Sequence, residues 1–127
     1  MSWLDYLNFR DEIAGTLDQR YYTLEWLDKQ ILRGHAKLWC CDEAVLITEF
    51  REYPTGAKDI HVLVAAGDMG KIVGELREDA EKWAKAHGCV GSLIESRQGW
   101  AKALKPFGYE AHQLIVRKEL VDGHVEE

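Results

Sequence analysis

The chain has 127 residues, of which 46% are hydrophobic and 30% charged, and its formal net charge is −6. This length suits one domain with one core, and the acidic balance argues against nucleic-acid binding because nothing neutralises a run of phosphates. No apolar run reaches the length of a membrane span, and residues 1–12 lack the basic start of a signal peptide. We therefore expect no membrane partner and a cytoplasmic location.

The first half of the chain predicts two helices followed by three strands. Residues 3–14 form a short helix, and Thr16 with Gln19 predicts a capping box that opens a second helix, which Gly34 ends. Strand patterns follow at residues 36–41, 44–53 and 59–66. Their connections are short, so the three strands should form an antiparallel meander.

The second half predicts a helix between strands. Asp68 can cap a helix that Gly88 ends. Further elements are predicted as a strand at 89–96, a short helix at 99–105 and a last strand at 111–120. A strand-helix-strand crossover is parallel and right-handed, so the sheet should be mixed and the fold class α/β. We expect one domain over residues 1–127, with residues 1–15 as an N-terminal helical extension and 121–127 as a loose tail.

The three cysteines do not predict a metal site. Cys40 and Cys41 are neighbours in a predicted strand, so their side chains point to opposite faces and cannot share one metal without distortion. Cys89 belongs to no C-x-x-C pair or spaced Cys/His set. We expect reduced thiols that pack as small hydrophobic groups.

The order of elements resembles the GNAT superfamily of acyl-CoA-dependent N-acyltransferases. "MGKIVG" (69–74), with the helix behind it, looks like the family's R/Q-x-x-G-x-G/A segment, and Gly108-Tyr109 looks like its closing Gly-aromatic corner. Met69 stands at the Arg/Gln position and Ile72 at the first glycine, so only Gly74 matches the signature. The family's first strand is missing or replaced by a helix.

The resemblance implies an acetyl-CoA site at the carboxyl end of the central strand, where consecutive backbone N–H groups at a helix start would hold the pyrophosphate. A β-branched Ile72 restricts close approach to that backbone, whereas Lys71 could supply a compensating charge. The candidate cofactor-binding residues are Val64, Ala65, Gly70, Lys71, Ile72, Val73 and Gly74.

The resemblance also implies an amine or protein acceptor, whose ammonium must lose a proton before it attacks the thioester. In the family a strand glutamate or a water chain often takes this proton. The candidates here are Glu49, Glu52 and His61, and nothing in the sequence selects among them. The family's tyrosine that reprotonates the leaving thiolate is replaced by Leu104.

A second reading is a non-catalytic protein that keeps the fold as a scaffold. The stretch Arg97-Gln98-Gly99-Trp100 looks like short GNAT-like proteins of tailed phages and prophages, and the missing signature residues favour this reading. Such a protein would be a structural or interaction protein, virion-associated if part of a phage particle. Independently of this reading, we expect Trp3, Tyr6 and Phe9 to dock on the sheet or to form the contact surface of a homo-oligomer or a phage protein partner.

Overall fold

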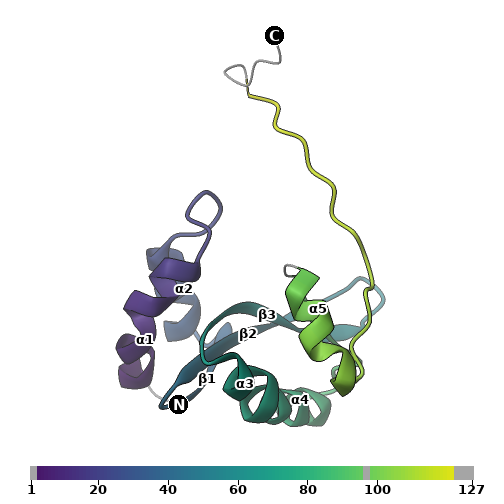
Figure 1. Ribbon diagram of the computed structural model, residues 1–127, viewed down its shortest axis with the longest axis horizontal. Coiled ribbons are helices and arrows are strands. Elements are labelled where there is room, and N and C mark those ends of the chain that lie inside the picture. Colours follow the sequence, from purple (N-terminus) through teal and green to yellow (C-terminus); the bar gives the residue numbers. More distant parts are fainter. Residues whose placement is uncertain (1–2, 96–97, 122–127) are drawn as a thin grey trace. The chain divides into compact units, whose positions relative to one another are not determined.

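The computed structural model describes residues 3–95 and 98–121 (Figure 1). By its internal contacts the chain divides into two compact units, residues 1–95 and 96–127. The first unit contains α1 (Trp3–Thr16), α2 (Leu24–Leu32), β1 (Ala36–Cys41), β2 (Ala44–Glu52), β3 (Lys58–Gly67), α3 (Met69–Lys71), a π-helical turn (Ile72–Leu76), α4 (Arg77–Ala86) and β4 (Gly91–Ile94). The second contains α5 (Gln98–Leu104) and a 3₁₀ turn (Lys105–Phe107). None of the described helices is long and apolar enough to cross a membrane.

One four-stranded sheet organises the first unit, in the order β1-β2-β3-β4. β1, β2 and β3 pair antiparallel, as the short connections predicted. β4 returns after the helical crossover and pairs parallel with β3. The predicted mixed sheet is therefore confirmed.

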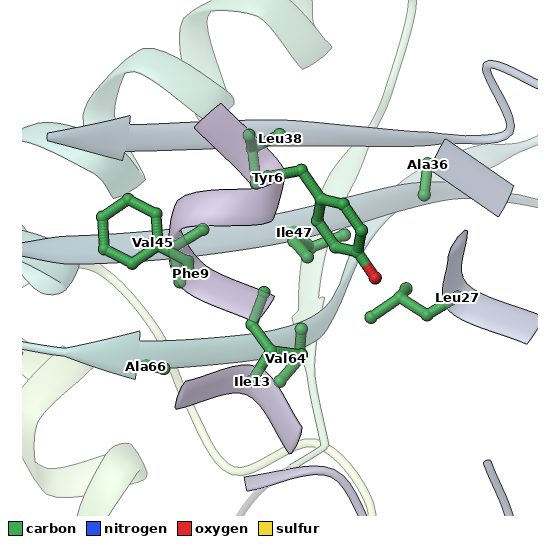
Figure 2. Close-up of a cluster of buried hydrophobic side chains, with 10 residues drawn as sticks. All are labelled: Tyr6, Phe9, Ile13, Leu27, Ala36, Leu38, Val45, Ile47, Val64 and Ala66. Carbon is green, nitrogen blue, oxygen red and sulfur yellow. The ribbon is translucent and has the colours of Figure 1, made fainter. Parts of the chain in front are cut away.

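Helices α1 and α2 cover one face of this sheet. Figure 2 shows the cluster of buried side chains that the two helices and the sheet form together. Tyr6 and Ile13 of α1 and Leu27 of α2 are fully buried. They pack with Phe9 against strand residues Ala36, Leu38, Val45, Ile47, Val64 and Ala66. Burying each large apolar side chain contributes roughly 1.5–3 kcal/mol, so the N-terminal helix is part of the core.

Helix α4 contributes an aromatic cluster on the opposite face of the sheet. The ring of Trp83 stacks on Phe50 at a centroid distance of 4.8 Å and meets the edge of Trp39 at 5.6 Å. Trp39 donates its Nε1–H to the buried hydroxyl of Thr48 at 3.0 Å. Both faces of β2 are therefore covered, which explains why its sequence barely alternates.

The predicted start of the second helix was wrong. Thr16 is the last residue of α1, and its hydroxyl donates to the carbonyl of Ile13. The N-cap of α2 is Thr23, whose hydroxyl accepts the N–H of Trp26 at 3.1 Å. Two threonines a few residues apart offer the same capping chemistry, and tertiary packing of α1 decides between them.

The predicted last strand at 111–120 was also wrong, because the structure describes no helix or strand between residues 109 and 121. Apolar and β-branched residues give this segment a strand-like sequence, but a strand also needs a partner edge. Before it, Gly108 adopts a φ of 92° at the end of the 3₁₀ turn, as the predicted corner requires. Predictions for Arg97 and for residues 122–127 lie outside the described residues.

Candidate active site

The structure brings two of the three predicted catalytic candidates together. Glu49 of β2 and His61 of β3 are register partners on the sheet face that α1 and α2 cover. The Nδ1 of His61 lies 2.8 Å from Oε2 of Glu49. His61 is only 4% exposed. The third candidate, Glu52, is exposed and pairs in register with Lys58, which places it on the other face of the sheet.

Sequence reasoning missed a second carboxylate at this pair. Glu95 follows β4 directly, and its Oε1 lies 2.9 Å from Nε2 of His61. Arg51, two residues after Glu49 on β2, donates from Nη2 to the same oxygen of Glu95 at 3.0 Å. Because Leu93 pairs with His61, Glu95 falls on the same face two residues later. Its only signal in the sequence was that it is the one charged residue of the strand predicted at 89–96.

Four side chains make contacts with one another in this group, which we call the His61 cluster (Glu49, Arg51, His61 and Glu95). Both ring nitrogens of His61 lie near a carboxylate oxygen, and Nη2 of Arg51 lies 3.3 Å from Nδ1 and 3.2 Å from Nε2, so three charged side chains surround the imidazole. The hydrogen bond from Arg51 holds the pKa of Glu95 below its usual value, against the opposing effect of burial.

β3 continues beyond its pairing with β4. The parallel register covers Asp59 to Val62, and residues 63–67 run on with no β4 partner among the described residues. Leu63 is an extra residue in β3, because Ile47 pairs with Val64 while the next residue of β2 pairs with Val62. This bulge lies at the point where β4 ends. The backbone of residues 63–67 therefore keeps one edge open within the first unit.

The segment predicted to cradle phosphate is helical from Met69 onward. Gly67 turns the chain with a φ of 105°, and a Cβ there would meet the backbone of Glu43 and Ala44. Asp68 caps the helix as predicted, and its Oδ1 accepts the N–H of Lys71 at 2.9 Å. The chain's own carboxylate thus occupies the helix start, a position that favours anions.

Within this helical segment the predicted cofactor residues divide into two groups. Ile72 and Val73 are buried, as is the side chain of Val64 on β3, so these residues can address a ligand only through their backbone. Gly74 is different, since a Cβ there would have no neighbour within 4 Å. A helical glycine costs roughly 0.5–1 kcal/mol relative to alanine, and no contact in the described structure requires this one. Its effect is to leave the helix backbone bare.

The positive charge of Lys71 is near an acidic side chain. Its Nζ lies 3.9 Å from Oε2 of Glu43, and both side chains are about half exposed. Such an exposed pair is weakly held, so the ammonium can turn to another anion at little cost.

Known structures share this architecture, although no known family model matches the sequence and no curated protein is significantly similar to it. Glucosamine-6-phosphate N-acetyltransferase from Arabidopsis thaliana superposes with a TM-score of 0.70 at 13% identity, covering 95% of each chain. An acetyltransferase from Trypanosoma brucei gives 0.67 at 14% identity, covering 94% of this chain and 96% of that one. The chain has the GNAT fold.

A third GNAT-fold neighbour was solved with acetyl-CoA. This predicted acetyltransferase from Clostridium acetobutylicum has a TM-score of 0.62 at 11% identity, covering 80% of this chain and 75% of that one. At such identities the likeness establishes the fold, and function has to be argued from the site itself.

Proposed function

We propose that the protein is an acyl-CoA-dependent N-acyltransferase that uses acetyl-CoA or a related thioester. The observation that carries this proposal is that β3 runs on without β4 after Val62 and leads, through Gly67 and Asp68, into a helix that starts at Met69. An open strand edge can hydrogen-bond the amide groups of the pantetheine arm. The helix start offers N–H groups to the pyrophosphate, and Gly74 keeps the adjoining backbone accessible.

In this proposal the amine nitrogen attacks the thioester carbonyl carbon, the new N–C bond forms, and the C–S bond breaks to release CoA as a thiolate that takes up a proton. Glu49 accepts the proton that the ammonium must lose, since its side chain is 28% exposed beside the buried His61. His61 and Glu95 orient this carboxylate. Backbone N–H groups of residues 63–67 stabilise the oxyanion of the tetrahedral intermediate.

One observation favours a second function, a non-catalytic GNAT-fold protein that binds a phage protein or another partner. The Asp68 carboxylate caps the helix at the place where a pyrophosphate would bind, so cofactor and carboxylate repel each other. A scaffold has no need of that anion site and can keep the cap for stability.

Calorimetric titration of the full chain with CoA and acetyl-CoA tests the first function. We expect micromolar binding, lost in Gly74→Trp, because the indole would cover the bare backbone without disturbing internal packing. Glu75→Trp is the matched control, since it places the same side chain at the exposed next position of the same helical turn. No binding by the folded protein at millimolar cofactor would exclude the acyltransferase and leave the scaffold.

A further inference from the structure

Residues 111–121 carry five large apolar side chains that are largely exposed. Their exposed fractions are 86% for Leu114, 69% for Ile115, 84% for Val116, 84% for Leu120 and 63% for Val121. Figure 1 shows the segment, in yellow, as an extended trace without strand pairing. So much exposed apolar surface on one short segment indicates an interaction surface.

The segment has the two faces of a strand. Arg117 and Glu119 form an ion pair, with Nη1 3.0 Å from Oε1, which puts alternate side chains on one side of an extended backbone. The other side carries Leu114, Val116, Lys118 and Leu120. One face is therefore mainly apolar and the other is charged near its centre.

We propose that this segment pairs antiparallel with the same segment of a second copy of the chain, with Lys118 on the two-fold axis. In that register Arg117 of each copy faces Glu119 of the other, and Val116 faces Leu120. Ile115 faces Val121 in the same way. Opposite charges and apolar pairs directly across an antiparallel ladder each contribute to its stability.

Neighbouring registers lose this match. With Arg117 on the axis, two guanidinium groups face each other and Glu119 meets Ile115. A shift by one residue places the apolar face of one copy against the charged face of the other. Of these registers, only the one centred on Lys118 pairs both Arg117 side chains with Glu119, and it leaves one like-charge contact, between the two Lys118 side chains at the axis.

The charges of Arg117 and Glu119 also favour a second copy of the chain, rather than the chain's own β4, as the strand that pairs with this segment. β4 has the sequence Gly-Ser-Leu-Ile, and the carboxylate that follows it, Glu95, already pairs with Arg51 and His61, so this strand offers Arg117 and Glu119 no charge match of its own. The two Lys118 ammonium groups meet at the axis of the proposed ribbon, where their long stems allow them to point apart. A two-stranded ribbon is marginally stable by itself, so we expect a dimer that dissociates on dilution.

Analytical ultracentrifugation of the full chain over a wide concentration range tests the dimer. Arg117→Glu puts like charges across the ribbon twice and should raise the dimer Kd about tenfold or more. The double variant Arg117→Glu with Glu119→Arg restores the pairs and should restore the wild-type Kd. A chain that stays monomeric at millimolar concentration, or a dimer that Arg117→Glu leaves unchanged, would overturn the proposal.

Disulfide trapping tests the register separately. In a background with Cys40, Cys41 and Cys89 changed to alanine, Lys118→Cys places two thiols on the axis and should give covalent dimers on oxidation. Leu114→Cys is the control, because its two copies would lie eight residues apart along the ribbon, roughly 27 Å. Equal trapping at both positions would contradict the register.

Discussion

His61 lies 2.8 Å from Glu49 across β2 and β3, a contact between residues twelve positions apart in the chain. A buried imidazole held between two carboxylates is expensive to desolvate unless every polar atom has a partner. No buried side-chain nitrogen or oxygen in the described residues lacks a hydrogen bond. The buried imidazole of His61 therefore has a hydrogen-bonding partner at each ring nitrogen, just before the open part of β3.

Glu49→Gln should lower kcat/KM for acyl transfer by about 10²–10⁴, because the amide keeps the shape of the side chain and cannot take a proton. CoA binding should stay unchanged. Thiol release during turnover measures the rate, and Glu52→Gln is the control, since Glu52 lies exposed on the opposite face. Equal losses in the two variants would remove Glu49 from the proposed chemistry.

Asp68→Ser should tighten CoA binding about two- to fivefold, because it removes a negative charge from the helix start while the hydroxyl still accepts the N–H of Lys71. Calorimetry measures the change. Asp79→Ser removes the same charge from an exposed position in the first turn of α4 and should leave the affinity as it is. Weaker binding in Asp68→Ser would mean that this carboxylate assists the cofactor.

Acid should weaken the attachment of α1 to α2. Asp28 accepts hydrogen bonds from Arg10 and, at 2.6 Å, from the Tyr6 hydroxyl. The hydrogen bond from Arg10 outweighs the opposing effect of burial and holds the pKa of Asp28 below its ordinary value of 3.8. Stability from a lowered carboxylate pKa is present above the unfolded value and is lost as pH falls through the folded value.

Asp28→Asn should therefore lower the urea midpoint at pH 7, and this difference from wild type should shrink as the pH falls below about 4. Denaturation curves at several pH values measure it. Asp18→Asn breaks an exposed pair with Arg20 and should change the midpoint little at any pH. A pH-independent difference for Asp28→Asn would show that shape rather than charge matters at this site.

Gly67→Ala should cost roughly 3 kcal/mol or more of unfolding free energy, because the new methyl group meets the Glu43 backbone at a φ of 105°. Gly34→Ala is the comparison, with a φ of 75° and nothing within 4 Å of its Cβ. It should cost about 1–2 kcal/mol, the penalty of the backbone conformation alone. Urea denaturation gives both values, and similar costs would contradict the close approach at Gly67.

Local pattern was enough to predict much of the fold. β1 spans residues 36–41 as expected, β2 ends one residue earlier than expected, and β3 is one residue longer at each end. β4 is shorter than predicted, at Gly91–Ile94, because only these residues find partners on β3. The missing strand at 111–120 has the same physical cause, since composition reports a preference for extended backbone but not the edge that satisfies it.

Within the site, chemistry could be predicted better than position. Residue type nominated Glu49 and His61, but only the register of β2 and β3 separates Glu49 from Glu52, three residues later on the opposite face. Glu95 joins the cluster through the parallel register of β3 and β4, and Arg51 joins it from β2, two residues after Glu49. Asp68 was predicted as a cap, and the helix does begin one residue later, where the resemblance places the pyrophosphate.

The extra residue at Leu63 has a consequence for how this protein can change over evolution. It restarts the alternation of β3, so His61 and Val64 share one face although an odd number of positions separates them. The side chains before the bulge and those after it therefore alternate between the two faces of the sheet independently of each other. A lineage could exchange the ionisable residues before the bulge, and with them the chemistry of the sheet's open end, while the hydrophobic side chains after it keep their places under α1.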